Sequence, residues 1–162
     1  MQQSKILQKQ ILYFINNPPD GANAIYYDND KSVYIRLVGP QNSPYEGGEF
    51  ILKIELVKDW PFSPPDFKML TPSGRFEPEK SICTSFSKFH STGWSPAISL
   101  NVLALSLLSF MMDNDTKHVG ATIVPYDDNA KKVFAGNSKR FNSSIRVKEG
   151  LLDSLLSPCV KK

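Results

Sequence analysis

The chain opens with a pattern of apolar positions that is typical of an amphipathic helix. Apolar residues recur there at steps of three and four, namely Leu7, Ile11, Phe14 and Ile15. Ser4 precedes them and is a residue type that often caps helices, so we expect it to begin the helix. A proline-containing turn over residues 16–21 then ends the pattern.

Alternation of apolar and polar residues predicts strands in the next part of the chain. Residues 33, 35 and 37 are apolar and share one side, which predicts a half-buried strand over 33–37. A second alternation runs from Phe50 to Leu56, and residues 43–48 carry the glycines and proline of a turn between them. A third short strand is expected over 67–70, after prolines that cannot sit within a sheet. Together they predict a small antiparallel meander.

The remaining pattern predicts a long loop and then helices. No periodicity appears from Thr71 to Trp94, and an irregular segment of that length in a compact domain is usually functional. Residues 97–112 are apolar on nearly every side, which predicts a buried central helix. Two further helices are expected over 127–142 and 144–156. Helix, strands, loop and helices in this order indicate an α+β domain.

Composition narrows the classes of function. The 162 residues suffice for one compact domain with a buried core, so we expect a single domain over 1–162. A net charge of +3 does not favour nucleic acid as a partner. The longest apolar stretch, 102–112, is shorter than the roughly 20 residues that cross a bilayer, so no membrane span is expected. The opening residues lack a secretory signal pattern.

Cysteine usage points to one candidate nucleophile. Only Cys83 and Cys159 are present, 76 positions apart, which is no disulfide framework and fits a reducing compartment such as the cytosol. Cys83 lies in the irregular segment, among hydroxyl side chains and between Lys80 and Lys88. A cysteine reacts as the thiolate, which such a polar setting favours. The alternative is a small apolar core residue.

A series of short motifs follows in order along the chain. It consists of Gly39-Pro40, Ser43-Pro44-Tyr45-Glu46-Gly47-Gly48-Glu49-Phe50, Trp60-Pro61-Phe62-Ser63-Pro64-Pro65, Ile82-Cys83 and Trp94-Ser95-Pro96-Ala97. This series resembles the ubiquitin-conjugating enzymes, the second-step carriers of the ubiquitin cascade, over about residues 5 to 155. The resemblance implies an N-terminal helix, an antiparallel four-stranded meander, a long active-site loop, a buried central helix and C-terminal helices. It also implies that Cys83 carries ubiquitin as a thioester and passes it to an acceptor.

Three details narrow the resemblance. Residues 71–76 read Thr-Pro-Ser-Gly-Arg-Phe where common members have His-Pro-Asn. Trp94 follows Cys83 by 11 positions, which is a longer loop than in most members. Ser85 stands where common members have an aspartate. These details are similar to the non-standard branch that is tail-anchored in the endoplasmic reticulum membrane. The chain departs from that branch at Ser73, which replaces the family asparagine, and at its final residues, which contain no membrane anchor.

The resemblance implies further catalytic residues. A hydroxyl donates one hydrogen bond, so Ser73 is the candidate for steadying the loop or the thioester oxyanion in place of the asparagine. Asp115 is the acid candidate, because the family places its acceptor-gating loop there; the alternative is a solvated residue at a helix end. His90 is the candidate base for a serine or threonine acceptor, which the branch is associated with besides lysine, and the alternative is a loop-packing histidine.

The resemblance also implies partners. Phe62 and the loop residues Ser95, Pro96 and Ala97 match the family's docking face for ubiquitin ligases, with a core plug as the alternative for Phe62. Lys5 and Lys9 match the site of the activating enzyme, with a solvated helix face as the alternative. Expected partners are therefore ubiquitin, its activating enzyme, a ubiquitin ligase and a protein substrate. No cofactor or metal ion is implied at this step.

Two rival functions stay open. One is a non-catalytic adaptor of the same fold that only binds ubiquitin, against which the presence of Cys83 argues. The other is a cysteine hydrolase that uses Cys83 with His90 or His118, although no asparagine or aspartate can be placed behind either histidine. The expected location is the cytosol, or the cytosolic face of the endoplasmic reticulum if an anchor follows Lys162.

Overall fold

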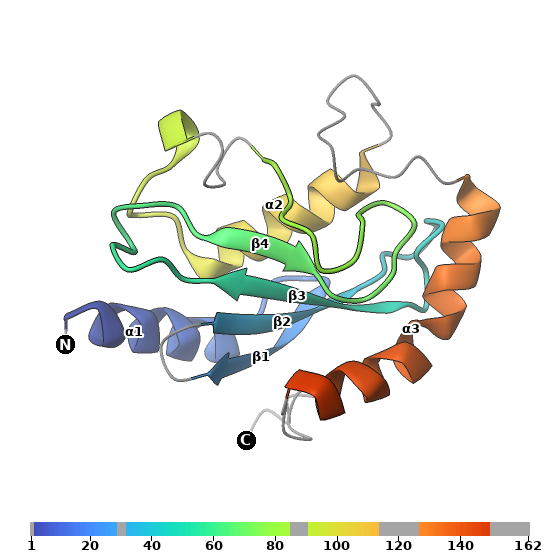
Figure 1. Ribbon diagram of the computed structural model, residues 1–162, viewed down its shortest axis with the longest axis horizontal. Coiled ribbons are helices and arrows are strands. Elements are labelled where there is room, and N and C mark those ends of the chain that lie inside the picture. Colours follow the sequence, from blue (N-terminus) through green and yellow to red (C-terminus); the bar gives the residue numbers. More distant parts are fainter. Residues whose placement is uncertain (1, 29–31, 85–90, 114–126, 150–162) are drawn as a thin grey trace.

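A four-stranded antiparallel sheet forms the centre of the fold. The computed structural model describes residues 2–28, 32–84, 91–113 and 127–149. The strands are β1 (Ala22–Asp28), β2 (Ser32–Val38), β3 (Glu49–Glu55) and β4 (Asp66–Met69), and each pairs with the next in chain order (Figure 1). The expected α+β class and the four-stranded meander are confirmed.

Strand β1 is the one strand that the pattern of residues did not locate. It pairs along β2 from Ala24 opposite Arg36 to Asp28 opposite Ser32, with a register shift between Ala22 and Ala24. Residues 24–27 are apolar in succession, so they show no alternation to distinguish them from the turn before them.

Two helices cover one face of the sheet. Helix α1 (Gln2–Asn16) contributes Leu7 and Phe14, and helix α2 (Leu100–Met112) contributes Leu103 and Leu107, to the main core. In Figure 1, α2 crosses behind β3 and β4. The sheet residues in this core are those of one side, in the phase that the alternation predicted: Val33, Ile35 and Leu37 from β2, and Leu52 and Ile54 from β3.

Helix α3 (Asp128–Glu149) packs on the opposite side, beside the sheet in Figure 1. Its Ile145 joins Tyr34, Ile51 and Leu70 in a second, smaller cluster. Because Tyr34 and Ile51 point away from the main core, β2 is buried on both faces. The prediction of a half-buried strand was therefore wrong, and the covering helix is the reason.

The first two helix starts differ from the prediction. Helix α1 begins at Gln2, so Ser4 lies inside its first turns and does not cap it. Helix α2 begins at Leu100 and not at Ala97, because Ser99 is its cap: the Ser99 Oγ accepts a hydrogen bond from the Val102 N–H at 3.3 Å. The predicted Ser4 cap was therefore wrong, and the predicted start of α2 was three residues too early.

Helix α2 is not buried on every side. Its buried residues recur at the spacing of one helix face, and the opposite face exposes Val102 and Leu105 to solvent. The apolar composition alone predicted burial all round and was misleading. Among the described residues, a short 3₁₀ turn, η1 (Ser91–Gly93), precedes this helix.

The two C-terminal helices expected from the sequence are one continuous helix as far as Glu149. Helix α3 starts after Asp127, whose Oδ1 accepts from the Ala130 N–H at 2.8 Å. Gly136 and the serines at 143 and 144 lie on its exposed side, where they do not interrupt packing. The rest of the predicted second helix, residues 150–156, is outside the described residues. No helix in the described ranges has both the length and the apolar character that crossing a membrane requires.

A buried asparagine fastens α3 to the sheet. The Asn142 side chain is fully buried; its Nδ2 donates to the Glu49 carbonyl at 2.8 Å, and its Oδ1 accepts from the Thr71 hydroxyl. Thr71 Oγ1 in turn accepts from the Ile51 N–H at 2.9 Å. One turn earlier, Ser138 Oγ accepts from the Glu49 N–H at 2.9 Å. These bonds join α3, the start of β3 and the loop after β4.

We predict that Asn142→Ala destabilises the domain by about 2–4 kcal/mol, because it leaves the buried Thr71 hydroxyl and the carbonyl of half-buried Glu49 without their partner. In a chain of this size the melting temperature should fall by roughly 5–15 °C. Asn137→Ala is the matched control, since Asn137 is exposed on the same helix and its side chain donates to the Val133 carbonyl one turn earlier. Equal melting temperatures for the two variants would contradict the assignment.

Tyr45 is a second polar group inside the core. Its side chain is buried and its ring is nearly perpendicular to that of Phe50, the ring centres being 5.9 Å apart. The chain passes so close that a Cβ on Gly39 would lie 1.7 Å from the Tyr45 carbonyl oxygen, so position 39 requires glycine. Burial raises the pKa of Tyr45 from its ordinary 10.0 to about 12, against the opposing charge of nearby Arg75.

The pKa of the Tyr45 phenol is higher in the folded than in the unfolded chain, so the neutral phenol favours the folded state. This contribution to stability is complete below pH 10 and is lost as the pH rises through 12. We therefore expect the free energy of unfolding of the parent to fall relative to Tyr45→Phe between pH 10 and 12, by roughly 2–3 kcal/mol. Urea titrations at several pH values measure the difference. Tyr13→Phe, which removes the hydroxyl of an exposed tyrosine, is the matched control.

Candidate active site

The segment that carries Cys83 runs along the edge of β4. The Glu79 N–H donates to the Met69 carbonyl at 2.9 Å, and the Ile82 N–H donates to the Phe67 carbonyl at 2.7 Å. Ile82 is fully buried and anchors the segment in the core. Cys83 follows it as a half-buried free thiol. The nucleophile candidate is thus partly open to solvent next to a rigid sheet edge, and it is not a sealed core residue.

The loop over residues 71–76 is organised by its hydroxyl side chains. Ser73 is fully buried, and its Oγ accepts hydrogen bonds from the Arg75 N–H at 3.2 Å and the Phe76 N–H at 3.3 Å. Gly74, with a φ of 72°, allows the tight turn between them. Ser73 therefore uses its oxygen as an acceptor inside the loop. Its predicted role toward an oxyanion stays a prediction.

Arg75 is a site-forming residue that the sequence analysis did not single out. Its buried guanidinium lies 5.3 Å from the ring centre of Phe110 and 6.0 Å from that of Phe76. Its Nε donates to the Phe110 carbonyl at 3.4 Å. A positive charge is favourable at the C-terminal end of a helix, where Phe110 lies in α2. The only sequence signal was an arginine within the motif that supported the family resemblance.

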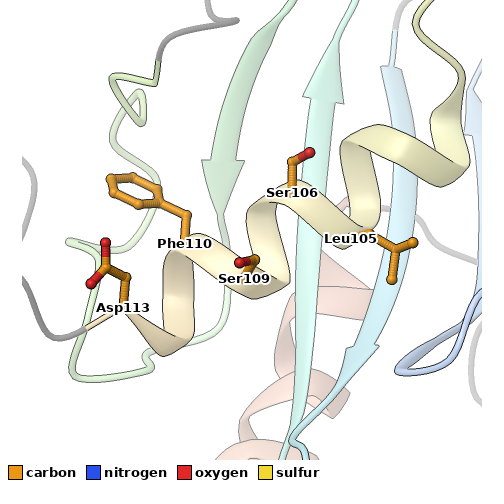
Figure 2. A pocket seen from close by; sticks show the side chains of 5 residues that line it. All are labelled: Leu105, Ser106, Ser109, Phe110 and Asp113. Atoms are coloured by element: carbon orange, nitrogen blue, oxygen red, sulfur yellow. The ribbon is translucent and has the colours of Figure 1, made fainter.

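An open hollow follows the last turns of α2, with a volume of about 570 Å³. Figure 2 shows the side chains that line it: Leu105, Ser106, Ser109, Phe110 and Asp113. Asp113 caps the helix with its backbone N–H bonded to the Ser109 carbonyl. The predicted acid Asp115 and the second histidine, His118, come directly after it in the chain and lie outside the described residues, as does His90.

The two predicted ligase-facing loops are held together. The Trp94 indole Nε1 donates to the Pro61 carbonyl at 2.7 Å, which ties the residues before Ser95 to the loop of Phe62. Phe62 is 77% exposed, which excludes the core-plug alternative. Ser95, Pro96 and Ala97 are exposed as well. The described residues thus bring these four side chains to one part of the surface.

Lys5 and Lys9 are exposed on α1, one turn apart, on a side of the helix away from the buried Leu7. This arrangement fits a basic contact surface and equally a solvated face. Within the described ranges, no three His, Cys, Asp or Glu side chains gather closely enough to hold a metal ion.

Comparison with known proteins gives the same family. The family model described as "Ubiquitin-conjugating enzyme" matches residues 6–148. The chain is 35% identical over 144 residues to "Ubiquitin-conjugating enzyme E2 6" of Kluyveromyces lactis, covering 88% of this chain and 56% of that protein. It is 42% identical over 106 residues to "Ubiquitin-conjugating enzyme E2 J2-like" of Dictyostelium discoideum, covering 65% and 61%.

A solved structure shares the fold. The "Plasmodium vivax ubiquitin conjugating enzyme E2" superposes with a TM-score of 0.55 at 27% identity, covering 66% of this chain and 98% of that one. The chain spans less than two thirds of the length of the curated relatives named above. The matched region contains the half-buried Cys83, the loop of residues 71–76 and the joined loops around Trp94. The chain belongs to the ubiquitin-conjugating enzyme family.

Proposed function

We propose that this chain accepts ubiquitin on Cys83 as a thioester and transfers it, together with a ubiquitin ligase, to an acceptor on a protein substrate. The observation that carries this proposal is the half-buried free thiol of Cys83, placed at a sheet edge within the region that matches the family. A nucleophilic cysteine must be accessible to the incoming carbonyl, and its backbone must be held in place. The hydrogen bond from the Ile82 N–H to β4 holds the backbone next to Cys83.

Charging is an exchange between two thioesters. The Cys83 thiolate attacks the carbonyl carbon of ubiquitin's C-terminus, a new C–S bond forms, and the activating enzyme's thiolate leaves. Since a thioester replaces a thioester, the step is near balance and demands mainly orientation. ATP is consumed before this step, and the step itself requires neither a metal ion nor a cofactor.

In discharge, the transfer of ubiquitin to the acceptor, Cys83 is the leaving group and no longer the nucleophile. A deprotonated lysine amine attacks the thioester carbonyl, an amide bond forms, and the Cys83 thiolate leaves. An unperturbed lysine has a pKa of about 10.4, so a nearby acceptor of its proton speeds the attack. We assign that role to Asp115 just beyond α2, and we assign to the Ser73 O–H the steadying of the loop or the oxyanion. A serine or threonine acceptor instead requires a base, for which His90 is our candidate.

Two surfaces are assigned to protein partners. The activating enzyme contacts Lys5 and Lys9 on α1, and the ligase contacts Phe62 with Ser95, Pro96 and Ala97. We place the enzyme in the cytosol, or at the cytosolic face of the endoplasmic reticulum, in line with the branch it resembles. The comparisons favour a conjugating enzyme over the adaptor alternative, since the relatives are named as enzymes and Cys83 is present.

We predict that incubation with activating enzyme, ATP and ubiquitin gives an adduct on a non-reducing gel that thiol reagents remove. Cys83→Ser should give an adduct of the same size that resists thiols, because an oxygen ester replaces the thioester. Cys159→Ser is the matched control and should charge like the parent. A chain that forms no adduct would support the adaptor, and cleavage of ubiquitin conjugates without ATP would support the hydrolase.

Phe62→Ala should reduce the acceleration of discharge by a cognate ligase about tenfold or more, because an exposed aromatic anchor is lost from the contact. Charging by the activating enzyme should change less than twofold. Phe141→Ala removes another exposed phenylalanine, on α3, and serves as the control. If ligase stimulation survived Phe62→Ala, the assigned docking face would be wrong.

His90→Ala should slow discharge to free serine or threonine several-fold while discharge to free lysine stays close to the parental rate. The reason is that a hydroxyl needs a base for attack, whereas an amine can lose its proton to solvent beforehand. Single-turnover discharge of the purified thioester to each amino acid measures the ratio. An unchanged ratio would remove His90 from the mechanism.

A further inference from the structure

A buried carboxylate lies beside the nucleophile segment. Asp66, the first residue of β4, is only 5% exposed. Its Oδ1 accepts from the Phe67 N–H at 3.0 Å, and its Oδ2 accepts from the Ser81 hydroxyl at 2.6 Å. Burying a carboxylate is costly unless its oxygens are hydrogen-bonded, so this group is tolerated because of those donors.

The Asp66–Ser81 bond lies two residues before Cys83. Ser81 also pairs with Lys68 through an isolated β-bridge, and the Ile82 N–H bonds to the Phe67 carbonyl. The two backbone contacts set the path of the segment along β4. The side-chain bond is a short hydrogen bond to a carboxylate, a type roughly twice as strong as one between neutral groups. The Asp66–Ser81 bond therefore restrains the segment two residues before Cys83.

The other end of this bond is firmly placed. Asp66 follows Pro64 and Pro65, whose rings fix the backbone φ angles, and Asp66 pairs with Glu55 in the sheet. Lys68, the cation on the same strand, bonds to Glu55 at 2.7 Å. Asp66 can consequently act as a fixed acceptor toward Ser81.

We propose that Asp66 is a positioning residue, which, by holding the Ser81 hydroxyl, fixes where Cys83 presents its sulfur for acyl transfer. The inference rests on the proposed function and deepens it, because it names the groups that orient the nucleophile. Asp66 touches neither the thioester nor the acceptor. Its loss should reduce the fraction of molecules in which the Cys83 thiolate can attack, or its thioester carbonyl can be attacked, in a productive geometry, and should leave the chemistry of the thiol itself unchanged.

The test uses the full chain with Cys159→Ser, so that Cys83 is the only thiol. Ser81→Ala removes the donor, Asp66→Asn keeps the shape and removes the charge, and Ser81→Thr keeps the hydroxyl. Ser143→Ala, an exposed serine on α3, is the matched control. Three quantities are measured for each: the melting temperature, the single-turnover rate of ubiquitin thioester formation, and the rate of alkylation by iodoacetamide from pH 6 to 9.

We expect Ser81→Ala to slow thioester formation about five- to twentyfold at saturating charged activating enzyme, with less than a twofold change in its KM. Asp66→Asn should slow it less, and the double variant should match Ser81→Ala, because both changes act on one bond. Alkylation should stay within twofold of the parent at every pH, and Ser81→Thr and Ser143→Ala should transfer at the parental rate.

Parental transfer rates in folded Ser81→Ala and Asp66→Asn would overturn the proposal. So would a parallel loss of alkylation and transfer, because that result assigns the effect to thiol reactivity, and so would additive losses in the double variant. If Ser81→Ala does not fold, Asp66→Asn and Ser81→Thr decide between these outcomes. A parent that forms no thioester would instead refute the proposed function, which distinguishes the two failures.

Discussion

The hydrogen bonds of the buried Asn142 are the constraint on which the arrangement of the domain depends. Among the α3 side chains that the structure describes, the buried apolar ones are Ala135 and Ile145, so apolar packing alone specifies the position of the helix weakly. The amide bonds to Glu49 on β3 and to Thr71 in the loop after β4. Because Asn142 and Thr71 are buried and Glu49 is half-buried, any displacement of α3 would leave several polar atoms without partners. The helix is thereby held in one place.

The same constraint reaches the candidate site through the loop of residues 71–76. Thr71 is fixed between Ile51 and Asn142, Ser73 closes the next turn, and Arg75 extends the chain of contacts to the end of α2 at Phe110. The far side of the fold and the last turn of α2 are thus joined by one short loop. The nucleophile segment depends on a separate set of contacts along β4, centred on Phe67 and Asp66.

Residue patterns predicted those parts of the fold whose burial has a regular period. The alternation over 33–37 and 50–56 located β2 and β3, and the prolines before Phe67 located β4. Strand β1 was missed because its apolar residues are consecutive. The burial of the second face of β2 was missed because it depends on Ile145 joining Tyr34 in one cluster, although the two residues are 111 positions apart. No local pattern carries that information.

The candidate site likewise contains residues that the sequence identified and residues that it did not. Cys83 and Phe62 were identified from residue type and motif, and their exposure in the structure agrees with the use proposed for them. Arg75, Asn142 and Asp66 were not identified, since a polar residue that will be buried looks the same in sequence as one that stays in water. Whether Ser73, Asp115 and His90 act in catalysis remains a prediction. Which buried polar groups bond to one another can be read only from the structure.

The hydrogen bond from Trp94 to Pro61 has a practical consequence. The chain has two tryptophans, and both lie at the joined loops: Trp60 is buried beside Pro61, and Trp94 bonds to that proline's carbonyl. Intrinsic fluorescence excited at the indole band therefore originates entirely from this corner of the molecule. The native protein carries its own optical reporter for events at that corner, with no label attached.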